Sequence, residues 1–289
     1  MPALAALVAI TVVWGLTFVQ VKNAVAVYPV VPFLAIRFLI ATLVLLPFGL
    51  RRAGSIGRSG LGAAVIAGTL LAAGYTLQTL GLERTSVSSA GFITGMYVVL
   101  TPVIGYLCFR LRVAGAAWAG VALATAGLAL LAGVHGGSPT GDLLVLAAAA
   151  VYALQIVLME RYAPRYDAFG FTLVEMAVTF GVLALAAAPS AAVPRGWTVW
   201  GALIVTGVFA SALGFLLQTW VQRETSATRT ALVFALEPVW AAVFGFTLAG
   251  DRLGVVGWAG CAVIMAGILV AEPAAAATLA RLVGRPRAA

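Results

Sequence analysis

Long apolar stretches alternate with short polar breaks along the whole chain. Each stretch is about 20 residues long, the length at which an α-helix crosses the hydrocarbon core of a bilayer, and the breaks contain charged residues, proline or glycine. Ten such spans occupy roughly 200 residues, which leaves no room for a separate soluble domain in a chain of 289 residues. The pattern predicts an all-α integral membrane protein with ten transmembrane helices, near residues 3–22, 31–50, 60–82, 88–108, 113–133, 142–160, 168–188, 198–222, 228–249 and 253–272.

The second half of the chain repeats motifs of the first half. The segment Gly74–Thr79, Gly-Tyr-Thr-Leu-Gln-Thr, returns 140 positions later as Gly-Phe-Leu-Leu-Gln-Thr at Gly214–Thr219. Each copy contains five predicted spans, an odd number, so the second copy starts from the opposite face of the membrane. We therefore expect a first five-helix repeat over 1–137, a second, inverted five-helix repeat over 138–272 and a basic cytoplasmic tail over 273–289.

Inverted repeats favour one functional class. Many secondary transporters use two such halves to alternate between outward-open and inward-open states. A duplicated static scaffold or channel is the alternative interpretation of the same pattern.

Composition and charge agree with a membrane protein. Hydrophobic residues make up 63% of the chain and charged residues 9%, against roughly 25% charged residues in soluble domains. The positive-inside rule places both termini in the cytoplasm, because alternate loops differ strongly in Lys and Arg. The net charge of +8 thus reflects membrane topology rather than a nucleic-acid partner, and we expect the tail to be solvated. One side holds Arg51, Arg52, Arg58, Arg110, Arg112, Arg161, Arg165, Arg223, Arg229, Arg281, Arg285 and Arg287; the other holds Lys22, Arg84, Arg195 and Arg252.

Few residues are suited to catalysis or metal binding. Cys108 and Cys261 lie within or at the edge of apolar spans, and His135 is isolated in a loop between the halves. The chain contains no HExxH, GxSxG or Walker motif. A membrane enzyme is therefore disfavoured, and we expect no cofactor and no metal. No Lys or Arg precedes the first span, so we interpret it as a retained helix rather than a signal peptide.

Several motifs together resemble the EamA family of the drug/metabolite transporter superfamily. They are Trp14-Gly15, the Phe-Leu-Ala-Ile-Arg-Phe run from Phe33, the Gly-Leu-Glu-Arg-Thr-Ser run from Gly81, the Ala-Gly-Phe-Ile-Thr-Gly run from Ala90, Leu236-Glu237-Pro238 and the closing Trp-Ala-Gly segment. The resemblance covers nearly the whole chain. It implies ten helices in two inverted repeats that carry small polar metabolites, often amino acids and frequently outward. The chain departs from the family's Leu-Gly-Glu pattern at Phe109-Arg110-Leu111 and at Ala249-Gly250-Asp251.

A candidate binding site follows from depth along each span. With a 1.5 Å rise per residue and a core about 30 Å thick, the midplane falls near the tenth residue of a span. Aromatic and hydrogen-bonding groups at that depth suit a small solute with an apolar part. The alternative for each ring is simple packing or contact with lipid. The predicted substrate-binding residues are Trp14, Thr17, Thr94, Tyr97, Tyr152, Gln155 and Glu237.

Charges within the spans are functional candidates because burying them in a membrane is costly. Glu237 precedes Pro238, which frees a backbone carbonyl and favours a kink. Glu237 could bind a substrate ammonium or carry a coupling proton, or it could only hold the kinked helix. Arg37 and Glu175 are counted as shallow and on opposite sides, so we expect them at the rims. The predicted gate residues are Arg37, Tyr75, Gln78, Glu175 and Gln218.

The sequence therefore predicts a multi-pass inner-membrane transporter that exports small metabolites by alternating access. Aromatic mid-depth positions favour a YddG-like exporter of aromatic and other apolar amino acids. A passive facilitator or channel, and a nucleotide-sugar or drug carrier of the same fold, are the alternatives. The expected partners are a small-molecule substrate and membrane lipid, with proton coupling possible, no nucleic acid, and a monomeric protein.

Overall fold

The computed structural model describes residues 2–131, 138–188, 193–252 and 254–271, and every regular element in these ranges is helical. The all-α prediction is confirmed for this part of the chain. His135, the boundary at 137 and the tail at 273–289 lie outside it. The elements are α1 (Pro2–Val25), α2 (Val30–Ala53), η1 (Gly54–Ile56), α3 (Gly57–Leu82), α4 (Val87–Thr94), α5 (Tyr97–Phe109), α6 (Gly115–Leu131), α7 (Pro139–Tyr162), η2 (Ala163–Arg165), α8 (Ala168–Ala187), α9 (Trp197–Ile204), the π-helix η4 (Val205–Leu213), α10 (Gly214–Val221), α11 (Ala227–Phe234), α12 (Leu236–Leu248) and α13 (Val255–Ala271).

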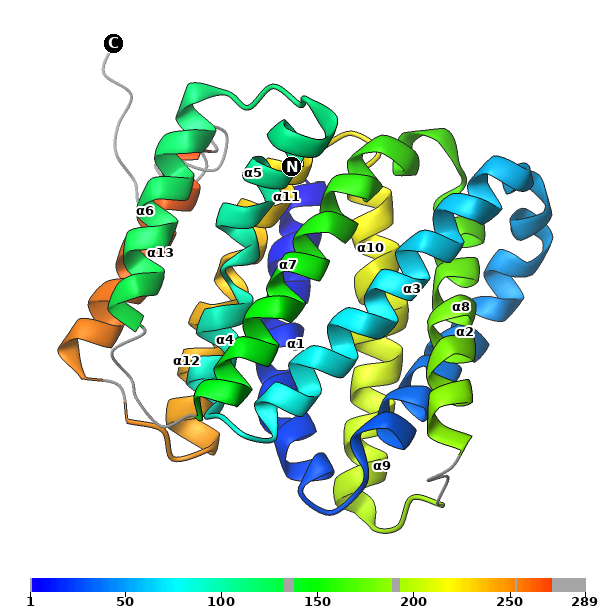
Figure 1. Ribbon diagram of the computed structural model, residues 1–289, viewed down its shortest axis with the longest axis horizontal. Coiled ribbons are helices and arrows are strands. Elements are labelled where there is room, and N and C mark those ends of the chain that lie inside the picture. Colours follow the sequence, from blue (N-terminus) through cyan, green and yellow to red (C-terminus); the bar gives the residue numbers. More distant parts are fainter. Residues whose placement is uncertain (1, 132–137, 189–192, 253, 272–289) are drawn as a thin grey trace.

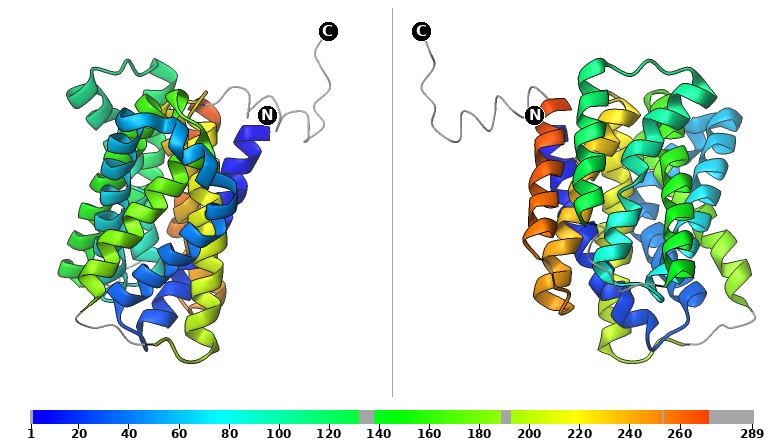
Figure 2. Two further views of the ribbon diagram at one scale, coloured as in Figure 1. Left: turned by 90° about the vertical axis from the view of Figure 1, so that its right-hand side faces the viewer. Right: turned by 60° about the vertical axis from the view of Figure 1, so that its left-hand side comes forward.

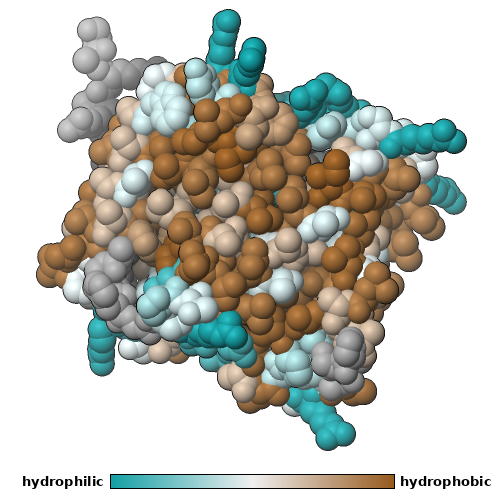
Figure 3. Space-filling model, viewed as in Figure 1, coloured by the Kyte–Doolittle hydropathy of each residue, from teal (hydrophilic) through white to brown (hydrophobic). Residues whose placement is uncertain are grey.

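Within the described residues, length and composition identify seven helical segments that can cross a membrane. One of them, Val30–Leu82, contains both α2 and α3, and the shorter apolar helices Gly115–Leu130 and Val255–Val270 come in addition. Apolar side chains cover most of the middle of the molecule in Figure 3, with hydrophilic groups toward the upper and lower edges. The chain is therefore built as a multi-pass membrane protein, and the count of ten crossings stays a prediction.

Equivalent elements of the two sequence copies lie side by side. Helix α2 packs against α8, and α6 packs against α13 at one edge of the molecule (Figure 1). Helix α3 packs against α7. The same contact recurs in the other half: α1, which corresponds to α7, contacts α9, η4 and α10, which together correspond to α3. Figure 2 shows the same neighbours from two further sides.

The arginine-rich connections gather at one end of the molecule. Figure 1 shows the turns α2–α3, α5–α6, α7–α8 and α10–α11 at its upper end, where the chain passes residues 51–58, 110–114, 161–167 and 222–229. These are the described loops assigned to the cytoplasm by the positive-inside rule. The orientation of the termini across the membrane stays a prediction.

Three predicted spans are interrupted near their middle. The span 88–108 is broken between α4 and α5, and the span 228–249 is broken at Ala235 between α11 and α12. The span 198–222 changes to π-helix over Val205–Leu213. Interrupted helices expose backbone groups at membrane depth, which is tolerated where they are buried in protein or line a cavity.

The buried core has two large clusters that meet at Tyr152. One cluster centres on α1, α2, α3 and α8, and the other on α5, α7, α11 and α13, with the side chain of Tyr152 packed against both. The space between the clusters is the candidate site.

Candidate functional site

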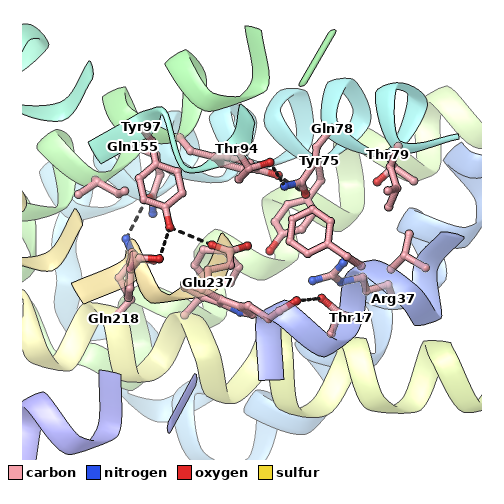
Figure 4. Close-up of a pocket in the computed structure, with 18 residues that line it drawn as sticks. Thr17, Arg37, Tyr75, Gln78, Thr79, Thr94, Tyr97, Gln155, Gln218 and Glu237 are labelled. Carbon is pink, nitrogen blue, oxygen red and sulfur yellow. Dashed lines mark hydrogen bonds between the residues drawn. The ribbon is translucent and has the colours of Figure 1, made fainter. Parts of the chain in front are cut away.

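A cavity lies between the two core clusters. It holds about 620 Å³ of unoccupied space, open solvent at its rim included. Figure 4 shows its lining side chains converging from both halves of the chain. They are Trp14, Thr17, Phe18, Val21, Arg37, Tyr75, Gln78, Thr79, Leu82, Thr94, Tyr97, Tyr152, Gln155, Ile156, Phe215, Gln218, Phe234 and Glu237.

The structure brings the predicted site residues together. All seven residues predicted to bind substrate line the cavity, and so do Arg37, Tyr75, Gln78 and Gln218 from the predicted gate set. Only Glu175 does not line it, although its side chain contacts Gln155. The two sets are therefore neighbours around one space, with Arg37 toward one end of Figure 4 and Gln218 toward the other. Their roles in binding or gating stay predictions.

The carboxyl group of Glu237 is held at the break between α11 and α12. Pro238 has no N–H to offer the carbonyl of Phe234 four residues earlier. The hydroxyl of Tyr97 lies 2.8 Å from that carbonyl oxygen and 2.9 Å from Oε2 of Glu237. The kink expected from the sequence thus has a polar partner on α5, and one carboxyl oxygen of Glu237 remains for a ligand.

The cationic group of the cavity is Arg37 on α2, whose residue is only 2% exposed. Its Nε donates to the hydroxyl of Ser211 at 2.8 Å, and its guanidinium carbon lies 4.3 Å from the ring centre of Tyr75. No carboxylate forms a salt bridge with Arg37 within the described chain. The guanidinium keeps further N–H donors, which suit a carboxylate or phosphate oxygen.

Aromatic rings from both repeats form the apolar wall. Trp14 stacks obliquely near Phe215, with ring centres 5.9 Å apart, and edge-on to Phe234 at 4.7 Å. Tyr75 meets the ring of Tyr152 edge-on at 5.4 Å. The indole of Trp14 donates to the carbonyl of Ala210 at 2.9 Å, inside the π-helical segment, where altered hydrogen bonding is often found next to functional sites.

Glutamine side chains connect the helices around the cavity. Gln78 donates to Thr94 at 3.0 Å and accepts a hydrogen bond from Tyr152 at 3.1 Å. On the other side, Gln218 donates to Gln155 at 2.9 Å. These bonds tie α3 to α4 and α7, and α10 to α7, so moving a helix at either side requires breaking amide hydrogen bonds.

Sequence reasoning missed several residues that line the cavity or contact its lining. Phe215 occupies the position of Tyr75 in the repeat, 140 residues later, so the repeat could have identified it. Phe234 and the Arg37 partner Ser211 carry no such signal, because an apolar or small residue in an apolar helix is typical of packing. Cys108 is exposed and Cys261 is buried, and the described residues contain no group of three or more His, Cys, Asp or Glu that could hold a metal ion.

Comparisons with known proteins identify a transporter family for this chain. The profile of the EamA-like transporter family matches residues 1–133 and 139–271. An uncharacterized transporter of Archaeoglobus fulgidus is 31% identical over 90% of this chain and 82% of its own length. The uncharacterized inner membrane transporter YedA of Escherichia coli K12 is 28% identical over 93% of this chain and 90% of its own. A solved crystal structure with 20% identity superposes with a TM-score of 0.75 over 95% of this chain and 98% of that one, which supports the fold alone.

Proposed function

The chain belongs to the EamA-like transporter family and is a multi-pass inner-membrane transporter, and on this premise we propose that it exports amino acids with apolar or aromatic side chains, as a YddG-like exporter. Transport would proceed by alternating access of the central cavity. No chemical conversion is required of it, and we propose that the monomer is the working unit.

One observation carries the choice of substrate: a cationic and an anionic side chain share an aromatic-walled cavity. Arg37 and Glu237 both line it, and they do not form a salt bridge with each other in the described structure. An α-amino acid would bring the complementary pair, its carboxylate to Arg37 and its ammonium to Glu237. Desolvated charges need such partners.

The side chain of the substrate would contact the rings. The rings of Trp14, Tyr75 and Phe215 line the cavity next to one another, and contacts with such rings favour apolar side chains.

Alternating access rests on the repeated architecture. We propose ten crossings in two inverted repeats, 1–137 and 138–272, with both termini and the tail at 273–289 in the cytoplasm. Secondary transporters commonly place their site between such repeats, at interrupted helices near the midplane. The breaks at α4–α5 and α11–α12 and the π-helix η4 lie next to the cavity, which supports this proposal.

The alternatives differ in what they require of the cavity. A nucleotide-sugar carrier would need several basic groups for a diphosphate, whereas Arg37 is the only Lys or Arg among the lining residues. A passive facilitator or channel of the same fold would need no alternation between two gates.

Counterflow in proteoliposomes tests the proposal. Vesicles holding unlabelled phenylalanine should take up labelled phenylalanine faster than empty vesicles, which a pore would not do. Among competitors, phenylalanine and leucine should inhibit, while phenethylamine lacks the carboxylate and phenylpropionate lacks the ammonium, so both should compete at least tenfold more weakly. Equal competition by either analogue, or inhibition only by a nucleotide sugar, would overturn the zwitterion assignment.

Arg37→Gln gives the matched residue-level test. It should abolish the preference for phenylalanine over phenethylamine, because the carboxylate of phenylalanine then has no cationic partner and gives it no advantage over the amine. Arg52→Gln is the control: Arg52 is exposed at the end of α2, where it forms a 3.9 Å surface ion pair with Asp167 and lies 4.8 Å from the ring centre of Phe169. Retained discrimination in the Arg37 variant would contradict the assignment.

A further inference from the structure

A second carboxyl group is buried away from the cavity. Glu175 on α8 is fully buried, at 0% exposure. Its Oε1 accepts a hydrogen bond from Nε2 of Gln155 at 3.0 Å, and its Oε2 has no hydrogen-bond partner among the described residues. The hydroxyl of Thr179 bonds the backbone carbonyl of Glu175, not its side chain. The carboxyl therefore has a single neutral donor.

No cation neutralises this carboxyl within the described chain. Helix α8 packs against α2, α3, α10, η4 and η1. Neither α10, η4 nor η1 contains a charged or titratable residue. The groups on α2 are Arg37, Arg51 and Arg52, those on α3 are Arg58 and Tyr75, and those on α7, which supplies Gln155, are Asp142, Tyr152, Glu160, Arg161 and Tyr162.

Each of these groups either bonds another partner or is exposed at the surface. Arg37 bonds Ser211 and lies over Tyr75. Arg51, Arg52, Arg58 and Arg161 are exposed. On α7, Asp142 accepts from Thr85, Tyr152 donates to Gln78, and Glu160 accepts from the N–H of Ala227; the remaining group, Tyr162, is partly exposed near the end of that helix. An ionised Glu175 would thus be an unpaired buried charge, whose cost is several kcal/mol, whereas a protonated carboxyl avoids that cost.

A chain of amides joins Glu175 to the cavity. Gln218 donates one N–H to Gln155 and the other to Gln222, each at 2.9 Å, and Gln222 donates to the carbonyl of Ile156 at 2.9 Å. Gln155 then donates to Glu175. Because Gln155 and Gln218 line the cavity, the bond from Gln155 links the buried carboxyl directly to a residue of the cavity wall.

We propose that Glu175 is a proton-binding site that couples proton movement to transport, distinct from the substrate-binding carboxyl of Glu237. This inference rests on the proposed function for its substrate. When Gln155 moves as the cavity opens, water reaches the carboxyl. The O–H bond of the acid breaks, the proton passes to that water, and the carboxylate left behind is stabilised by water and by the amide of Gln155. The hydrogen bonds from Gln218 to Gln155 and from Gln155 to Glu175 re-form in the closed cavity only after a proton has returned to the carboxylate of Glu175.

Two measurements on reconstituted full-length protein test the coupling: counterflow of phenylalanine, and its net accumulation driven by an imposed pH gradient. In Glu175→Gln, counterflow should stay within about twofold of wild type, while accumulation driven by the gradient should be lost. Glu224→Gln, an exposed carboxyl beyond the end of α10, should keep both activities. Retained gradient-driven accumulation in Glu175→Gln, or its absence in the wild type, overturns the proposal.

A chemical measurement keeps the proposal testable if that variant does not fold. Dicyclohexylcarbodiimide modifies protonated carboxyls in apolar surroundings, and peptide mapping locates the adduct. On wild-type protein, modification of Glu175 should occur at neutral pH and decline as the pH is raised, and absence of modification throughout overturns the proton site. If no amino acid showed counterflow with the wild-type protein, the proposed function would be rejected. The labelling would still show whether Glu175 is protonated.

Discussion

The hydroxyl of Tyr97 lies 2.8 Å from the carbonyl oxygen of Phe234, so a residue of the first repeat satisfies a backbone group that a proline of the second repeat leaves open. The same hydroxyl is 2.9 Å from Oε2 of Glu237. A phenol has one hydrogen and can donate to only one of these acceptors at a time. The hydrogen-bond state of the α11–α12 break therefore depends on whether Glu237 carries a proton or meets a cation.

Tyr97→Phe removes this hydroxyl while keeping the ring. We expect a loss of about 1–3 kcal/mol of stability, the cost of leaving buried polar groups without a partner, seen as a lower Tm of the detergent-solubilised protein. Tyr106→Phe is the matched control, because Tyr106 lies on the same helix and is 63% exposed. Equal Tm values for the two variants would show that the hydroxyl does not stabilise the break.

Arg37→Lys keeps the charge but changes its shape. A lysine cannot reproduce the Nε bond to Ser211 or the flat contact with Tyr75, and it meets a carboxylate as a point charge rather than a fork. We expect roughly a tenfold weaker apparent affinity for phenylalanine, about 1.4 kcal/mol, measured from the concentration dependence of counterflow. An unchanged affinity would mean that charge alone is recognised.

Apolar run length was a sufficient guide to where helices occur, and much less to where they break. The span predicted at 60–82 is α3, Gly57–Leu82. The π-helix Val205–Leu213 left no sequence signal, because its backbone pattern depends on tertiary partners such as the Trp14 indole bound to Ala210. Pro238 does predict the break between α11 and α12, because its missing N–H is a property of the residue itself and can be read from the sequence.

Depth along a helix identified the seven predicted binding residues that line the cavity, but it did not identify the other residues that meet them there. Counting residues gives height in the membrane and says nothing about lateral position. The count predicts Arg37 at a rim and Glu237 at mid-depth, whereas the structure places both around one space. Helices α2 and α3 run obliquely in Figure 1, and the count assumed upright helices. The chain Gln155–Glu175 also joins residues of different helices, which no spacing within one helix can reveal.

Gly15→Ala tests close packing beside the cavity. A Cβ at Gly15 would lie 2.4 Å from Cβ of Trp240 and 2.9 Å from the backbone nitrogen of Ala241, so α1 and α12 must separate. We expect a destabilisation of about 1–3 kcal/mol, as for other overpacked cores. Gly62→Ala is the control: a Cβ there meets nothing within 4 Å, and a helical Ala should be neutral or stabilise by about 0.5–1 kcal/mol. Thermal unfolding in detergent measures both, and equal Tm changes would contradict the packing argument.

The repeated Gln-Thr pairs lead to a prediction about the two gates. Gln78 stands near the end of α3 and ties it to α4 and α7, whereas Gln218 stands near the end of α10 and ties it to α7. Figure 4 shows Glu237 between them along the cavity. Removing either amide should loosen one side only, so Gln78→Ala should favour opening to the outside and Gln218→Ala opening to the cytoplasm.

A single cysteine in the cavity can report this shift. In a background with Cys108 and Cys261 replaced by Ser, Thr17→Cys would be labelled with a membrane-impermeant thiol reagent added to one side of oriented vesicles. Gln78→Ala should raise labelling from outside and Gln218→Ala should raise it from the cytoplasmic side, while Thr69→Ala, which loses only a bond within α3, should change neither. Shifts in the same direction would instead mean that the two glutamines belong to one shared binding site. Residues of a shared site do not control access from opposite sides of the membrane.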